Sequence, residues 1–232
     1  MQAMEVQPTE GEAVSEPGAE LPRRAARRRA TERALRTAAI GLITERGYDA
    51  TSTSDIAAVA GVTQRTFFNY FPTKEAVVLP PADFLADVAT AALRSRPIGE
   101  DVPASLAAAA MRTTRTFAAS ALDDAGEPDG RRELSLAVVR LVFGEPAVRK
   151  LFLERRAAVE EAVWETLIER GASPDDLEAR SAVSTVVALT YLALRIWAEG
   201  GGVEPLPAVC ARCLLTAPDP ARFAAGVTAT DT

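Results

Sequence analysis

Apolar residues recur along this chain at spacings of three and four, the period of helices that bury one face. The clearest stripe lies in a helix predicted from about Arg27 to Arg46 and consists of Leu35, Ala38, Ala39, Leu42 and Ile43. Runs of β-branched and aromatic residues, which would indicate strands, are sparse. The pattern therefore predicts an all-α protein.

The second half of the chain continues as helices separated by Pro and Gly, with Pro at or near several helix starts. The predicted helices are Asp83–Arg96, Pro103–Asp123, Arg131–Phe143, Pro146–Glu169, Pro174–Glu199 and Pro205–Thr216, with a short one near Pro220–Ala225. Pro80 and Pro81 interrupt the helix that begins at Thr73, either as a kink or as a plain boundary with a loop. The most apolar run, Ala182–Leu194, is too short to span a bilayer, so we expect no membrane partner.

Two short helices joined by a tight turn precede these helices. Ser52 or Thr53 can cap the first of them, and Gly61 ends it because a left-handed residue after the last turn is least costly as Gly. Thr63 caps the second helix, whose Phe67 points toward the core. Together with the preceding long helix they predict a three-helix unit containing a helix-turn-helix, whose second helix is free to enter a major groove.

The outer face of that second helix is suited to nucleic acid. Gln64 and Arg65 lie in its first turn, where Gln can bond adenine and Arg can bond guanine. Lys74, at the start of the next helix, can meet a phosphate together with free backbone N–H groups. The rest of the face consists of Thr66, Phe68, Asn69 and Tyr70. The alternative is a three-helix core segment with a solvated polar face.

The distribution of charge favours DNA binding although the net charge is −6. Residues 21–75 hold ten Lys and Arg against five Asp and Glu, whereas residues 76–232 hold sixteen against twenty-two. A basic module joined to an acidic body is typical of a DNA-binding domain with a separate regulatory domain.

The chain starts with a Glu-, Pro- and Gly-rich stretch, residues 1–22, which we expect to be disordered. It lacks the apolar segment of a signal peptide, so we expect a cytoplasmic protein. The run of five arginines in Arg23–Arg29 follows. It is either a solvated charge run or an arm that contacts phosphates or the minor groove.

The stretches Thr31–Ala39, Glu45–Ser52 and Asp55–Ala76 closely resemble the N-terminal domain of TetR-family transcriptional regulators. The resemblance covers Thr31 to about Val78. It implies a phosphate contact at Thr53 and base reading by Ser54, Gln64 and Arg65. It implies backbone contacts by Thr66, Phe68, Tyr70 and Lys74, although many members carry Tyr at the position of Phe68.

The resemblance also implies the organisation of the whole chain. We expect a disordered tail at 1–22, a helix-turn-helix DNA-binding domain at 23–78 and an α-helical effector-binding and dimerisation domain at 79–232. The last long helices would form a four-helix bundle across the two-fold axis of a homodimer. The motif Gln64–Pro72 further resembles a subgroup with proposed acyl-CoA-like effectors.

An enzyme is not expected, because the chain has no histidine and no Gly-rich phosphate loop. No cofactor and no metal are expected either. Cys210 and Cys213 lie on one helix face, where they are either packed residues in a reducing compartment or partners of their copies across a dimer axis.

Candidates for an effector site are aromatics of the body and arginines inside apolar runs. Arg140 and Arg195 each interrupt such a run, and a buried guanidinium needs an anion, from a ligand or from the protein. The aromatic candidates are Phe84, Phe117, Phe143, Trp164 and Tyr191. The sequence thus predicts a dimeric repressor that binds a palindromic operator in double-stranded DNA and is released by a small apolar or acyl-type effector. The alternatives are a constitutive DNA-binding protein, or an enzyme or binding protein with a vestigial helix-turn-helix.

Overall fold

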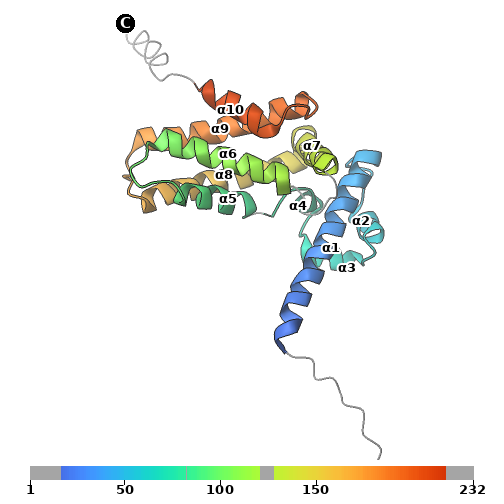
Figure 1. The fold of residues 1–232 in the computed structure, drawn as a ribbon. Helices are drawn as coiled ribbons and strands as arrows, with labels where there is room; N and C mark the ends of the chain where they lie inside the picture. Colours follow the sequence, from blue (N-terminus) through green and yellow to red (C-terminus); the bar gives the residue numbers. More distant parts are fainter. Residues whose placement is uncertain (1–16, 82, 121–127, 218–232) are drawn as a thin grey trace, which may run out of the picture.

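The computed structural model describes residues 17–81, 83–120 and 128–217. Within them the chain forms ten helices and no strand, as the predicted all-α class requires (Figure 1). The helices are α1 (Pro17–Arg46), α2 (Thr53–Val59), α3 (Gln64–Tyr70), α4 (Lys74–Val78), α5 (Phe84–Arg94), α6 (Val102–Ser120), α7 (Pro128–Gly144), α8 (Pro146–Glu169), α9 (Leu177–Glu199) and α10 (Leu206–Leu215). The short tail helix predicted near Pro220–Ala225 lies outside the described residues.

Local capping fixes α2 and α3 where the sequence predicts them. Ser52 is the N-cap of α2 and forms a reciprocal capping box with Asp55. Gly61 adopts φ 69°, a left-handed conformation that makes the turn to α3 possible. Thr63 caps α3 by accepting a hydrogen bond from the N–H of Thr66. The helix-turn-helix is therefore specified by contacts between residues close in sequence.

Helix α1 starts earlier than the sequence predicted. It begins at Pro17 rather than at about Arg27, so residues 17–22 of the predicted disordered tail are helical. Pro17 is favoured at the first helical position, and Ala19, Glu20 and Leu21 are strong helix formers, although Gly18 and Pro22 are poor ones. The arginine run is consequently part of a helix, whose N-terminal portion extends past α2 and α3 (Figure 1).

The core of the helix-turn-helix region continues into the body. Residues of α1 to α4 form one buried cluster that includes Leu35, Ile56 and Phe67, each fully buried. The same cluster contains Val138 and Val142 of α7, and Val148 of α8. The predicted boundary between residues 78 and 79 therefore lies within a shared hydrophobic core.

The body is a bundle in which α5 packs on α6 and α8, and α9 packs on α6, α8 and α10. Two further buried clusters fill it, one around Trp164 and Leu167, the other around Phe117 and Trp197. Pro80 and Pro81 end α4 and separate it from α5 by a loop, so the double proline is a plain boundary and not a kink within one helix.

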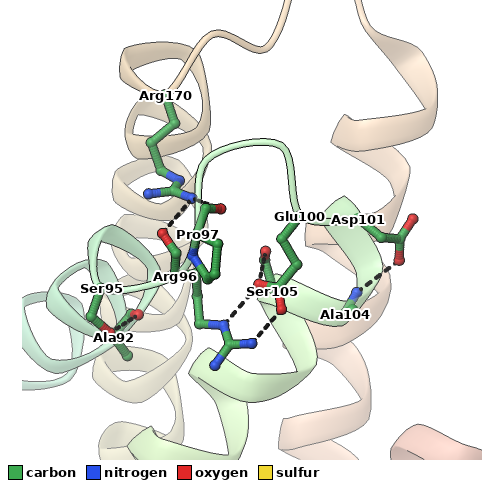
Figure 2. Close-up of polar contacts among 9 residues, drawn as sticks. All are labelled: Ala92, Ser95, Arg96, Pro97, Glu100, Asp101, Ala104, Ser105 and Arg170. Carbon is green, nitrogen blue, oxygen red and sulfur yellow. Dashed lines mark hydrogen bonds and ion pairs between the residues drawn. The ribbon is translucent and has the colours of Figure 1, made fainter.

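Polar contacts fix one end of the body, where the loop from α5 to α6 meets the end of α8 (Figure 2). Arg170 donates to the carbonyls of Arg96 and Pro97 at 3.0 and 2.9 Å. Glu100 accepts from Arg96 Nε at 2.8 Å and from Ser105 Oγ at 2.6 Å. These hydrogen bonds lower the pKa of Glu100 to about 2.

By length and composition alone, helix α9 could cross a membrane. The run Ala182–Leu194 considered in the sequence is only the central part of this helix. In the structure α9 packs on four other helices, α6, α7, α8 and α10. Its C-terminal half also carries exposed apolar side chains, Leu192 and Ile196.

Both cysteines are buried within the chain, in the cluster around Phe117 and Trp197. Burial raises the pKa of the Cys210 and Cys213 thiols, which favours the unreactive thiol form. Both cysteines are therefore packed core residues, the first of the two alternatives that the sequence left open.

Candidate functional site

The exposed face of α3 presents a cluster of polar and aromatic side chains. Gln64, Arg65 and Asn69 are exposed, and the Phe68 ring is 50% exposed. The Gln64 side-chain amide donates to Thr53 Oγ1 of α2 at 2.9 Å. Ser54 is exposed on α2. The helix-turn-helix thus brings the predicted base-reading residues together on one surface.

Two residues that are predicted to contact phosphate, Lys74 and Thr66, have hydrogen-bond partners within the domain. Lys74 Nζ donates to the carbonyls of Tyr48 and Thr51 at 2.7 and 3.0 Å, and it lies 3.8 Å from the centre of the Tyr48 ring. Thr66 Oγ1 lies 2.8 Å from Thr63 Oγ1. In the free protein Lys74 therefore holds the loop between α1 and α2, a structural role that the sequence did not predict.

The N-terminal part of α1 carries five arginines, one of which lies beside α3. Arg23 to Arg29 are exposed along the helix. The Arg28 guanidinium lies 5.7 Å from the ring centre of Tyr70, the last residue of α3. The basic part of α1 therefore adds positive charge beside the end of α3.

The body contains a cavity of about 120 Å³ between α5, α6, α8 and α9. Its wall is almost entirely apolar and includes Leu79, Pro80 and Pro81 of the loop after α4. The other lining residues are Leu85, Ala89, Leu106, Ala109, Ala110, Thr113, Phe152, Arg155, Arg156, Val159, Val163, Val183, Val186, Val187, Thr190, Tyr191 and Leu194.

Two arginines of α8, Arg155 and Arg156, line this cavity. Arg155 donates to the carbonyl of Pro80, and burial lowers its pKa, with the nearby charge of Arg36 acting in the same direction. Arg156 Nε is buried and has no hydrogen-bond partner among the described residues. The Arg156 guanidinium lies 5.5 Å from the ring centre of Tyr191.

Of the predicted effector-site residues, only Tyr191 lines the cavity. Arg140 and Arg195 are exposed, so the expectation of buried guanidinium groups at these positions was wrong. Arg195 forms a surface ion pair with Glu199 at 2.9 Å.

The other aromatic candidates are packing residues. Phe117 and Trp164 belong to two different buried clusters, and Phe84 is half-buried at the start of α5. Phe143 does not line the cavity but packs against Tyr191, with 5.2 Å between the ring centres. The cavity therefore draws its aromatic lining from Phe152 and Tyr191.

Helical spacing carried a signal for the arginines that line the cavity. Arg155 and Arg156 lie at intervals of three and four from Phe152 and Val159, which both line the cavity. Charged residues at positions of an apolar stripe indicate a polar group that faces the interior. Arg140, in contrast, follows exposed Glu133 by seven residues and therefore shares its solvent-facing side.

Two adjacent carbonyls join the cavity wall to the helix-turn-helix region. The carbonyl of Leu79 accepts a hydrogen bond from Arg36 of α1, which is only 6% exposed. The carbonyl of Pro80 accepts one from Arg155 of α8. Arg36 also pairs with Glu32 at 3.3 Å and lies 5.0 Å from the ring centre of Phe71. One arginine from each region therefore holds the loop between α4 and α5.

Comparison with known proteins establishes the family. The model for "Bacterial regulatory proteins, tetR family" matches residues 35–79, from the middle of α1 to the end of α4. TcmR, an HTH-type transcriptional regulator of Streptomyces glaucescens, is 30% identical over 173 residues, which span 73% of this chain and 74% of TcmR. The chain belongs to the TetR family. This TetR-family protein is also 30% identical over 164 residues to CymR, an HTH-type transcriptional regulator of Pseudomonas putida, with 66% of this chain and 75% of CymR covered.

Solved structures share the fold of this TetR-family chain. The fatty acid degradation regulator FadR of Bacillus halodurans aligns with a TM-score of 0.53 and 18% identity over 80% of this chain and 93% of its own. A tetR family regulator of Shewanella sp. PV-4 aligns with a TM-score of 0.50 and 18% identity, over 80% of this chain and 94% of its own.

Membership of the TetR family confirms the predicted fold class, an N-terminal helix-turn-helix domain followed by a helical domain. It also confirms that the chain is a DNA-binding transcriptional regulator and not an enzyme.

Proposed function

We propose that this TetR-family regulator is a homodimeric, cytoplasmic repressor that binds a palindromic operator and is released by a small apolar or acyl-type effector held in the body cavity. The observation that carries the proposal is the position of the cavity. Its wall includes Leu79–Pro81, and the carbonyls of Leu79 and Pro80 are held by arginines of the two regions.

The proposed dimer is supported by the exposed surface of the last two helices. Leu192 and Ile196 of α9 are 42% and 37% exposed, and Leu215 at the end of α10 is 86% exposed. Burying such side chains against a second copy would remove apolar surface from water. A two-fold axis through this surface gives a four-helix arrangement of α9 and α10 from both protomers.

In the proposed complex, α3 of each protomer enters a major groove, with half-site centres about 34–36 Å apart or a multiple of that. Gln64, Arg65 and Ser54 read bases. Thr53, Thr66, Phe68, Asn69, Tyr70 and Lys74 contact or approach the sugar-phosphate backbone. Lys74 can donate only its third ammonium proton to a phosphate, because the other two are donated to the carbonyls of Tyr48 and Thr51.

Release follows from the shared loop. An effector that fills the cavity contacts Pro80 and Arg155, and any displacement of their hydrogen bond acts on the end of α4. Helix α4 packs on α1 and on α8, so its position fixes that of the helix-turn-helix. The effector then favours a dimer whose two α3 helices no longer match one operator.

The experiment is an operator selection from random duplexes followed by a release screen with apolar and acyl-type compounds. We expect a palindromic site and a compound that lowers operator affinity by about 5- to 150-fold. Arg155→Met should bring that ratio toward one, because the cavity then no longer holds the Pro80 carbonyl. Arg140→Met, the same exchange on the exposed side of α7, is the control and should retain the wild-type ratio. A selected operator with no releasing compound would favour the constitutive regulator instead.

A further inference from the structure

Arg156 is the polar group of the cavity that the protein itself leaves unsatisfied. Its Nε is buried without a hydrogen-bond partner, and no carboxylate of the described residues pairs with its guanidinium. The cavity lining contains two arginines and no Asp or Glu. A buried donor on a charged group costs free energy unless an acceptor reaches it. A ligand in the cavity could supply the acceptor that Arg156 Nε lacks.

Three other polar side chains in the wall already donate to backbone carbonyls. Thr113 and Thr190 donate to the carbonyls of Ala109 and Val186 in their own helices, at 2.9 and 2.8 Å. Arg155 is engaged with the Pro80 carbonyl. Besides apolar side chains, a ligand in this cavity therefore meets Arg156 and the hydroxyl-bearing ring of Tyr191, which lies against the Arg156 guanidinium.

The position of Arg156 in the apolar wall indicates where a ligand would carry its charge. Phe152 and Val159 lie one turn away on either side of it along α8, and Tyr191 faces it from α9. If the anionic group of a ligand lies beside Arg156, the rest of the ligand must therefore be apolar, because it contacts the apolar side chains of α6 and α9. This arrangement fits a molecule with one charged end.

We propose that the cavity binds an amphipathic anion, an apolar chain or ring that ends in a carboxylate or a similar oxyanion, and that Arg156 is the residue that binds its charged end. The inference deepens the proposed effector-controlled function and rests on the same cavity. A planar guanidinium matches a carboxylate, and a charge-assisted hydrogen bond in an apolar wall discriminates strongly against an uncharged analogue.

The test compares three probes with the same chain and different ends: octanoate, 1-octanol and octylammonium. Titration calorimetry on the full-length protein should show octanoate binding about ten-fold or more tightly than 1-octanol, and no binding of octylammonium. Arg156→Met should bring the affinities for octanoate and 1-octanol to within about three-fold of each other. Arg140→Met should retain the wild-type preference.

Arg156→Lys and Arg156→Gln separate charge from folding. Lys keeps the positive charge and should retain part of the preference for octanoate. Gln removes the charge and should lose that preference, which keeps the test valid if the Met variant does not fold. The proposal is overturned if wild-type protein binds octanoate no better than 1-octanol, if octanoate does not bind, or if Arg156→Met and Arg156→Gln retain the preference.

Operator release is measured separately, so the two proposals can fail independently. Binding of octanoate with the anion preference, but without release of operator DNA, supports the anion site and contradicts effector control. Release by 1-octanol as readily as by octanoate supports effector control and contradicts the anion site.

Discussion

The outer face of α3 and the inner face of α8 both present arginines, but in opposite surroundings. Arg65 on α3 is exposed beside other polar side chains. Arg156 on α8 faces an apolar wall with its Nε buried. The exposed Arg65 guanidinium is free to be hydrated, whereas the buried Nε of Arg156 has no acceptor in the described residues. The difference shows that the position of an arginine on the helix stripe, more than its neighbours in sequence, decides its surroundings.

Phenylalanine truncation should show the largest contrast between the two regions. Phe67 is fully buried under α3, whereas Phe152 is half-buried and lines the cavity. We expect Phe67→Ala to lower the free energy of unfolding by about 3–5 kcal/mol. Phe152→Ala should cost roughly 1–2 kcal/mol, because one side of its ring already lacks packing partners. Denaturant unfolding of both variants measures the difference, and equal losses would contradict an open cavity beside Phe152.

Base reading by α3 gives the next effect. Gln64→Ala or Arg65→Ala should each cost roughly 1–3 kcal/mol on the selected operator and change the preferred sequence. The effect at Gln64 should be the smaller of the two, because its amide must give up the hydrogen bond to Thr53 before it can bind a base. Binding assays on the operator and on a random duplex test it. Equal losses on both DNAs would show that these residues contact phosphate only.

The basic part of α1 should act without regard to sequence. Replacing Arg27, Arg28 and Arg29 together by Gln preserves helix propensity while removing three exposed charges. We expect weaker binding to all duplexes and a shallower slope of log affinity against log salt, by up to about 0.9 for each lost phosphate contact. An unchanged slope would place these arginines away from DNA.

Acid stability should show the smallest effect, at the far end of the body from α3. The pKa of Glu100 is lowered from 4.5 to about 2 by its hydrogen bonds with Arg96 and Ser105. Its contribution to stability is therefore complete above pH 4.5 and is lost as the pH falls from there to about 2. Glu100→Gln should be less stable at pH 7 and lose less stability across that window. Melting curves at several pH values measure this, and an identical pH profile would contradict the role of Glu100.

The helix-turn-helix could be predicted from sequence because its determinants are local. Ser52, Gly61 and Thr63 act on backbone groups within a few residues, and Phe67 follows from helical spacing. The start of α1 was predicted too late because a polar, Pro-containing stretch has no apolar stripe to mark it.

The cavity was harder to predict because it depends on which helix faces meet. Arg140 lies in a more apolar run than Arg156, yet it points to solvent, since each helix places every third or fourth residue on the same side. The engagement of Lys74 with Tyr48 and Thr51 joins residues more than twenty positions apart, a distance over which spacing alone gives no information.

The double proline after α4 limits how motion can pass between α4 and α5. Pro80 and Pro81 carry no backbone N–H, so no helical hydrogen bonds can continue from α4 into α5 through these residues. A rotation of α5 is therefore not passed to α4 as twist along a continuous rod. Under the proposed effector control, a displacement in the body would reach α4 through two carbonyls, each of which accepts a hydrogen bond from one arginine. The two hydrogen bonds are separate contacts, so Arg155→Met removes the one from α8 to the Pro80 carbonyl while the one from Arg36 of α1 to the Leu79 carbonyl remains.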